Sequence, residues 1–487
     1  MTRRFPLLTL AGLLALGACA EEARDPVSPS TPSLAESNTA VRGINVVLKS
    51  RPTQSQLARL NSIGRVKTIF KEINGLTMAA KGSQLRAIRA LPFVKAAAFD
   101  AVIHIPPPTD LVPVEDFTGG FSTWNQDAID VTIAPLSSAR DVSQTGQGVY
   151  VGVLDTGLLW TWRQYFPEER IATQFARTFV GGGAADRGRV VEQDGNQWQH
   201  DVCSHGTHVT STILGFQAGA LRFQGTAPRA TIIPVRLHTA GSANARISCP
   251  FFSSVAAAAL IYFGNLKRGP LAGEPLVVNN SWGGPPDPLK QAAVDYALAQ
   301  GVLLVFAAGN SGTAGMSHPA SYPPVISAAA SGWVGEWKPC ASTGPGADPL
   351  NWWLVCNVPE PTDPDDFYIT DFSARELNGQ DLDVAAPGSW VLGPFQLQMG
   401  KPDFFFLGGT SMAAPHVTGT VALMLQKRPS LTQAQAETIL QNTAIGIGAG
   451  CRDVVPFPGL PETEICWTAN ATGEGLLDAD AAVAATP

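Results

Sequence analysis

Charged residues are scarce in this sequence of 487 residues, and they form no long blocks. Asp, Glu, Lys and Arg together make up 15% of the chain, and the net charge is −7. Such a mild, dispersed charge does not indicate a nucleic-acid or membrane-surface partner. Apolar residues make up 45%, which is enough for a large core and excludes a disordered chain. Composition therefore predicts a folded globular protein and nothing more specific.

Long apolar runs are lacking too, since none reaches the roughly 20 residues that a transmembrane helix needs. The run over residues 5–16 follows two arginines and precedes small residues, which predicts a secretory signal peptide over residues 1–18. Its last residues, LGAC, resemble the lipobox of bacterial lipoproteins, in which the cysteine is diacylated. We therefore expect a secreted protein whose precursor is held in the cell envelope by a lipid on Cys19. An ordinary signal peptide is the alternative.

Cysteine is rare, with seven in the whole chain. Setting Cys19 aside leaves an even number in an exported protein, which predicts disulfides. Two pairs are close in sequence and could each close a short loop, Cys340 with Cys356 and Cys451 with Cys466, and this leaves Cys203 and Cys249. Six cysteines allow about fifteen connectivities, so this pairing is a preference only.

The patterning along the chain predicts five segments. Residues 19–42 are rich in Ser, Pro, Ala and Glu and predict a flexible tether. Residues 43–105 show strand and helix patterns in the order β-α-β-β-α-β, which predicts a small α+β, ferredoxin-like module. Residues 106–120 form a linker marked by Pro and Gly. The rest, residues 121–487, follows the signal, tether, module and linker as one large domain.

Apolar strands alternate with helical stretches in this large domain. The strands are expected at residues 148–155, 230–237, 275–280, 301–308, 323–330 and 382–387. The helices are expected at residues 253–266, 288–300, 411–426 and 432–443. Continuous Val, Ile and Leu in the strands predict an α/β fold with a mostly parallel sheet and helices on both faces. In such folds the active site lies beyond the carboxyl ends of the strands.

Three motifs carry groups that can perform chemistry. Asp155 ends a predicted strand, although an Asp before a Gly is more often only a turn. His205 begins the HGTHV motif at the start of a helical run. His200, Cys203, His205 and His208 could instead form a zinc site, but their spacing is irregular for one.

The third motif, GGTSMAAPH at residues 408–416, is the most specific. Its two glycines allow a sharp turn, and Ser411 then stands at a helix N-terminus, where free N–H groups favour developing negative charge. A serine there is usually only a helix cap. An ordinary cap, however, does not need these flanking residues.

Together, DTG at residues 155–157, HGTHV at 205–209 and GTSMAAPHV at 409–417 resemble the subtilisin-like serine proteases, in that family's order of Asp, His and Ser. The resemblance also covers GTAP at 225–228, SWGG at 281–284, AGN at 308–310 and residues 473–483. It implies that His205 takes the proton of Ser411, while Asp155 orients the imidazole. It implies that Asn310 and the backbone N–H of Ser411 stabilise the oxyanion.

The resemblance further implies that residues 43–105 are an inhibitory propeptide, removed by autocleavage within residues 106–120. It assigns seven residues to substrate binding, with no carboxylate among their segments, so we expect a preference for uncharged side chains at the cleaved position. These are Ser281, Trp282, Gly283, Gly284, Ala308, Gly309 and Ser317. The expected partners are protein or peptide substrates and the chain's own propeptide, and the expected state is a monomer.

The sequence departs from the family's pattern in two places. Residues 333–371 form an insertion with four Trp, which we interpret as a surface loop stapled by a disulfide in preference to a substrate or partner contact. Residues 215–225 lack the Asn-bearing calcium loop of many relatives. We expect no cofactor for catalysis and assign no metal site, and the sequence does not support structural calcium. A degenerate, non-catalytic binding protein is disfavoured because Asp155, His205, Asn310 and Ser411 are all present.

Overall fold

The structure is a computed structural model that describes most of the chain outside the N-terminal region. The described residues are 40–103, 111–113, 122–133, 139–183, 189–193, 195–201, 203–219, 221–238, 249–339, 352–356, 358–398 and 400–487. The predicted signal peptide, Cys19, all but the end of the tether and most of the linker lie outside them. Within these residues, no helix combines the length and the apolarity needed to cross a membrane.

The N-terminal module (residues 40–103) has the predicted order of strands and helices. It consists of β1 (Val41–Leu48), α1 (Gln54–Asn61), β2 (Arg65–Phe70), β3 (Gly75–Lys81), α2 (Leu85–Arg89) and β4 (Val94–Phe99). The strands form an antiparallel sheet in the order β2-β3-β1-β4. Apolar side chains such as Ile44, Leu60, Met78 and Ile88 pack into a core of the module's own.

The large domain is built on a nine-stranded sheet that contains all six predicted strands. These are β7 (Tyr150–Asp155), β12 (Thr231–His238), β14 (Leu276–Asn280), β15 (Leu303–Ala307), β16 (Ile326–Trp333) and β18 (Val384–Pro387). Every pairing among them is parallel. The remaining strands were not predicted: β8 (Arg177–Val180) pairs parallel with β12, whereas β9 (Val191–Gln193) and β17 (Phe367–Ile369) are antiparallel edge strands.

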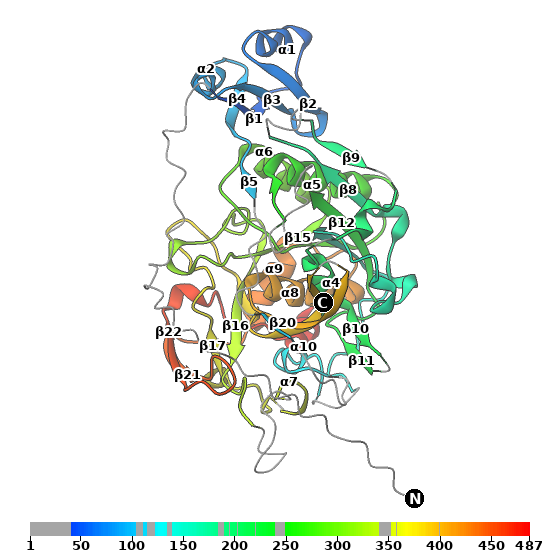
Figure 1. Ribbon diagram of the computed structural model, residues 1–487, viewed down its shortest axis with the longest axis vertical. Helices are drawn as coiled ribbons and strands as arrows, with labels where there is room; N and C mark the ends of the chain where they lie inside the picture. Colours follow the sequence, from blue (N-terminus) through cyan, green and yellow to red (C-terminus); the bar gives the residue numbers. More distant parts are fainter. Residues whose placement is uncertain are drawn as a thin grey trace, which may run out of the picture.

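Helices cover both faces of this sheet, as predicted. One set comprises α4 (His205–Leu214) and α8 (Thr410–Lys427), and the other comprises α5 (Ser253–Arg268) and α6 (Pro288–Ala299). In β7, a Cβ built on Gly152 would meet Phe263 of α5, whereas the Cβ of Asp155 lies beside Gly206 of α4. Residues three apart in a strand point to opposite faces, so α5 and α4 lie on opposite sides. The helices α9 (Gln433–Thr443) and α10 (Ala479–Ala485) pack near α8 (Figure 1).

Several short hairpins lie outside the central sheet, and none of them was predicted. They are β10 (Gly215–Ala218) with β11 (Leu221–Gln224), β19 (Val391–Gln398) with β20 (Lys401–Leu407), and β21 (Gly450–Val454) with β22 (Thr463–Trp467). The strand β6 (Leu111–Pro113), inside the predicted linker, pairs with β20. The short helix α3 (Trp124–Asp127) begins the large domain.

Two of the preferred disulfides are present in the described residues. Cys451 and Cys466 join β21 to β22, and Cys203 joins Cys249 across 46 residues. Cys356 is also disulfide-bonded, while its preferred partner Cys340 lies outside the described residues.

The interpretation of residues 333–371 as a surface loop is wrong for their aromatic part. Trp333, Trp337, Trp352 and Trp353 are all buried. Trp337, Trp352 and Trp353 pack against Phe406 of β20. Trp333 and Trp124 pack against Trp352, and α7 (Trp352–Val355) contributes Trp352 and Trp353. Burial of such large rings is strongly favourable, so the described part of the insertion extends the core of the domain.

The predicted last strand of the module is divided into two. β4 ends at Phe99, and β5 (Val102–Ile103) pairs antiparallel with β13 (Phe251–Phe252) of the large domain. Between them, Asp100 accepts hydrogen bonds from the backbone of Gly183 and from Ser254. The sheet of the module meanwhile lies over α6 (Figure 1). The module is thus docked beside the amino ends of α5 and α6.

Candidate active site

Asp155 and His205 are in direct contact at the carboxyl end of β7. The imidazole Nδ1 of His205 lies 2.9 and 3.0 Å from the two carboxylate oxygens of Asp155, and both side chains are buried. The backbone N–H of Thr156 donates to the same carboxylate at 2.7 Å. With Nδ1 occupied by the carboxylate, Nε2 is the ring nitrogen left to exchange a proton with another group.

The start of α4 is held against the end of β7 by a second, separate contact. Thr156 accepts from the backbone N–H of Gly206 and donates to Asp201, both at 2.8 Å. A Cβ on Gly206 would lie 2.4 Å from the carbonyl oxygen of Gly157. Glycine is therefore required there for the approach of the helix to the strand. Burial raises the pKa of Asp201 to about 7.

Ser411 is the second residue of α8, as expected for a serine at a helix start. Its hydroxyl donates to the carbonyl of Ser281 at 3.2 Å, and the hydroxyl of Ser281 donates back to the carbonyl of Ser411 at 2.8 Å. Gly409, two residues before it, has φ 150°, a conformation that favours glycine. In this arrangement the Ser411 hydroxyl is bonded to Ser281 and has no hydrogen bond to His205.

Asn310 follows β15 and lies beside the start of α8. Its Oδ1 accepts from the backbone N–H of Thr410 at 3.0 Å and from the Thr410 hydroxyl at 2.8 Å. Thr410 also receives a bond from the N–H of Gly309. Because Oδ1 is held in this way, the Nδ2 donor of Asn310 stays available, and within the described residues it has no partner.

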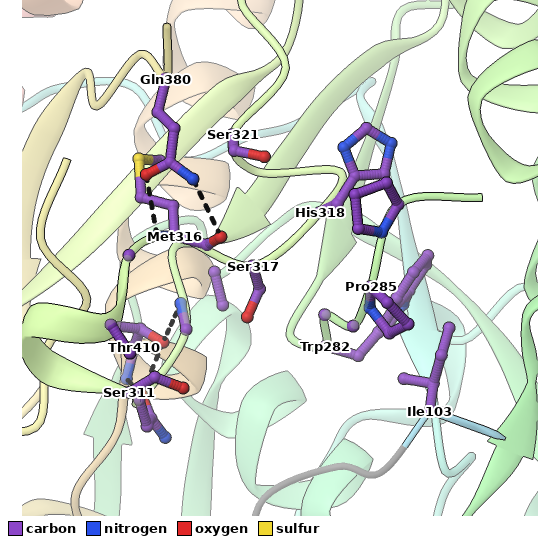
Figure 2. A pocket seen from close by; sticks show the side chains of 18 of the residues that line it. Ile103, Trp282, Pro285, Ser311, Met316, Ser317, His318, Ser321, Gln380 and Thr410 are labelled. Carbon is purple, nitrogen blue, oxygen red and sulfur yellow. Dashed lines mark hydrogen bonds between the residues drawn. The ribbon is translucent and has the colours of Figure 1, made fainter. Parts of the chain in front are cut away.

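A cleft of about 770 Å³ opens beside these groups. Its near end contains Asn310 and Ser411, and its far end contains Trp282 and Ile103. Figure 2 shows Ser317 between Thr410, beside the near end, and Trp282. No charged side chain is among the described residues that line it. The cleft is therefore electrically neutral and partly apolar.

The residues predicted to bind substrate fall into two groups. Five of them line the cleft: Trp282, Gly283, Gly284, Gly309 and Ser317. A Cβ on Gly283 or Gly309 would lie 2.4 Å from the Ser317 side chain, so both glycines are needed for the walls to approach each other. Ser281 and Ala308 are fully buried directly behind the walls, where Ala308 accepts from the N–H of Ser317.

The cluster considered as a zinc site is not assembled for one. Cys203 is engaged in its disulfide with Cys249, and His205 is engaged with Asp155. His208 lies along α4 with Nε2 at 3.0 Å from the carbonyl of Val391. Burial lowers the pKa of His208 to about 3, so it is a neutral, packed residue.

Acidic side chains gather at two places that the sequence analysis missed. Asp381, Asp383 and Glu437 offer oxygens within 4.8 Å of one another. A separate cavity of about 290 Å³ is lined by Asp130, Asp141, Glu360, Asp478 and Asp480. Carboxylates are the ligands that calcium prefers, so these groups could hold a cation. Their spread over the sequence left no local motif. Residues 215–225 contain no carboxylate and form the hairpin β10–β11, which does not fit calcium.

Three further residues near the cleft were not singled out by the sequence analysis. Thr410 fixes Asn310, Gln380 binds the backbone of Met316, and Lys290 reaches the carbonyls of two wall residues. Gln380 and Met316 are bonded in Figure 2. Only Thr410, inside the motif around Ser411, could have been found from the sequence.

Comparisons with known proteins identify the family of this chain. The model of the subtilase family matches residues 146–478. The chain is 30% identical to "Subtilisin BL" of Lederbergia lenta over 350 residues, which cover 72% of this chain and 95% of that protein. It is 27% identical to the "Extracellular protease" of Xanthomonas campestris pv. campestris over 482 residues, which cover 93% of this chain and 70% of that protein.

Among solved structures, the fold is similar to fervidolysin from Fervidobacterium pennivorans, described as a keratinolytic enzyme related to subtilisin. The TM-score is 0.61 at 23% identity, covering 92% of this chain and 62% of that one. The parallel sheet with helices on both faces is thus shared. This chain belongs to the subtilase family of serine proteases.

Proposed function

We propose that this protein is a secreted serine endopeptidase in which Asp155, His205 and Ser411 form the catalytic triad. The observation that carries the proposal is the bond of 2.9 Å between His205 Nδ1 and Asp155, at the end of β7 and inside the domain that bears Ser411. A serine hydroxyl is a weak nucleophile at neutral pH and needs an adjacent base. His205 Nε2 is the nitrogen available for that task.

In the reaction, the Ser411 hydroxyl turns from the Ser281 carbonyl toward His205 and attacks the substrate carbonyl as it loses its proton. His205 then gives this proton to the leaving amine. Asp155 keeps the imidazole in one tautomer and stabilises its charged form. The developing oxyanion is stabilised by Asn310 Nδ2 and the backbone N–H of Ser411 at the start of α8. Water then hydrolyses the acyl-enzyme.

Substrates are expected to bind as an extended strand along the cleft, as β5 does beside β13. A neutral lining favours uncharged side chains near the cleaved bond, because an unpaired charge buried there would be costly. A peptide library dominated by basic or acidic residues at the cleaved position would contradict this.

The N-terminal module is proposed to be an inhibitory propeptide. Ile103 is almost fully buried at the far end of the cleft, where a substrate side chain would bind. β6 pairs with β20, which precedes Ser411 in the chain. β5 instead pairs with β13, and its residues line the cleft. We therefore expect autocleavage between residues 103 and 111. Sequencing the N-terminus of the mature protein tests this.

A lipid on Cys19 would remain attached to the propeptide after that cut, so the mature enzyme would be released. The precursor should then be found in the membrane fraction and the mature form in the soluble fraction. A precursor that is not labelled by radioactive palmitate would leave a plainly secreted protease.

Labelling with a serine-reactive fluorophosphonate tests the enzyme assignment. The mature protein should be labelled with or without a zinc chelator, and the Ser411→Ala variant should not be labelled. Absence of labelling in the mature wild type would instead favour a non-catalytic binding protein.

A further inference from the structure

The side chain of Lys290 is buried directly behind the far end of the cleft. Lys290 is fully buried in the first turn of α6. Its ammonium group donates to the carbonyl of Pro285 at 3.1 Å and to the carbonyl of His318 at 2.9 Å. It also lies 5.9 Å from the centre of the Trp282 ring.

The two carbonyls belong to opposite walls of the cleft. Pro285 follows Gly284 on one wall, and His318 follows Ser317 on the other. Gly284 and His318 exchange backbone hydrogen bonds of 2.9 and 3.1 Å, so the carbonyl of His318 accepts from both Gly284 and Lys290. Figure 2 shows His318, Pro285 and Ile103 toward the same end of the cleft, with Pro285 between the other two.

A buried ammonium group is costly unless nearby groups compensate it. The carboxylate of Asp287, the N-cap of α6, is the charge that favours the protonated form of Lys290. Asp287 itself accepts from the backbone N–H groups of Leu289 and Lys290 and from the Asn45 side chain of the module. The ammonium group therefore donates its hydrogen bonds to the two walls and not to Asp287.

We propose that Lys290 is a positioning residue for substrate recognition, which ties Pro285 to His318 and so sets the width of the far end of the cleft. The inference rests on the proposed function, because it concerns where an upstream side chain of the substrate binds. Lys290 does not line the cleft, so it acts through the walls and not by contact with the peptide.

The wall that carries Ser317 and His318 is anchored differently at its near end, at Met316. Gln380 accepts from the N–H of Met316 at 3.0 Å, and its Nε2 lies 3.3 Å from the Met316 carbonyl. This anchor is neutral and does not titrate. Loss of Lys290 should therefore affect recognition at the far end alone, and only the far end should depend on the protonation of a lysine.

The test compares peptides that carry Ile or Ala at each position upstream of the cleaved bond. In the wild type, one position should prefer Ile strongly, since the far end holds Ile103. In Lys290→Met, that preference should fall by at least about fivefold through KM, with kcat within about twofold. Preferences at the other positions should not change.

Lys267→Met is the matched control, because among the described residues Lys267 on α5 donates only to the carbonyl of Glu274. It should keep the wild-type selectivity. Lys290→Arg, which retains the charge, should lose less selectivity than Lys290→Met. Unchanged selectivity in a folded Lys290→Met variant would overturn the proposal.

The pH dependence of the wild type gives a test that needs no variant. Burial lowers the pKa of Lys290 to about 8. The facing groups are Asp287 and His318, and the pKa of His318 is lowered to about 4, so His318 is neutral throughout. The protonated form of Lys290 ties the two walls most strongly, so the Ile preference should fall gradually as the pH rises through the pKa of Lys290. A preference that stays constant from pH 6 to pH 10 would refute the role of Lys290. A wild type that cleaves no peptide would instead refute the proposed function.

Discussion

Two buried carboxylates, Asp155 and Asp100, differ in where their partners lie: one is held within a single domain and the other across a domain interface. Asp155 on β7 contacts His205 on α4, and both elements belong to the large domain. Asp100 belongs to the N-terminal module but accepts from Ser254 at the start of α5 in the large domain. Separating the module therefore leaves the first contact intact and exposes the second carboxylate to water. The proposed catalytic contact is permanent, and the proposed inhibitory contact is reversible.

The contact around Asp100 is polar and includes a second carboxylate, Asp287. The Asn45 side chain donates to Asp100 at 3.1 Å and to Asp287 at 2.9 Å, so one amide group bridges two carboxylates across the interface. All three residues are buried. Burial raises the pKa of Asp100 and of Asp287, and each carboxylate raises the cost of ionising the other. The contact is therefore sensitive to the protonation state of both groups.

The largest effect is expected from Ser411→Ala. If the permanent contact is the catalytic one, this variant should be inactive and should keep its N-terminal module covalently attached, because it cannot cut itself. Electrophoresis of protein made in a protease-deficient host measures this. Maturation of the variant on its own would show that another enzyme cuts the linker.

Asn310→Ala should lower kcat by roughly 10²–10³-fold, a magnitude measured for an oxyanion donor of subtilisin itself. The reason is that the substitution removes the Nδ2 donor, which Asn310 can turn toward the oxyanion because its Oδ1 accepts from Thr410. KM should change little, because the charge develops after substrate binding. Steady-state kinetics of the mature enzyme decides it, and an unchanged kcat would remove Asn310 from the mechanism.

The large domain, which contains the Asp155–His205 contact, was easier to predict from the sequence than its interface with the N-terminal module. The six predicted strands are continuous apolar runs, and the motifs around Asp155, His205 and Ser411 are local in sequence. The short hairpins such as β19–β20 and the burial of Trp352 could not be predicted, because they depend on packing between distant segments. Lys290, Gln380 and Asp100 were missed for the same reason: their partners lie far along the chain or on the other wall.

Asp100→Asn should reduce the pH dependence of module release. In the docked state the pKa of Asp100 is raised, and after release it returns to its ordinary acidic range. Docking therefore binds a proton: the module is held most tightly at acidic pH and less tightly as the pH rises through the raised pKa. The effect is at most about tenfold in affinity per pH unit for one group.

The lag before full activity measures this release in the self-processing full-length chain. The lag should shorten as the pH rises in the wild type, and it should depend less on pH in Asp100→Asn. The mature enzyme is identical in both, because residue 100 lies in the released part, so differences in turnover do not interfere. A lag independent of pH in the wild type would refute this account of the interface.

The smallest effect concerns a carboxylate whose hydrogen-bond partner lies within the large domain. Asp127 of α3 is fully buried and accepts from the N–H of Val358, and burial raises its pKa to about 7, with Glu360 and Asp130 adding to the shift. Its ionisation costs stability progressively as the pH rises from about 4 to about 7.

Asp127→Asn keeps an oxygen for Val358 and removes that cost. In the presence of a chelator, the variant should be about 1–2 kcal/mol more stable than the wild type at pH 8 and nearly equal at pH 4. Denaturant unfolding of the mature Ser411→Ala domain, released by an added protease, measures this without self-digestion. A variant that is less stable at pH 8 would show that the ionised Asp127 contributes to stability.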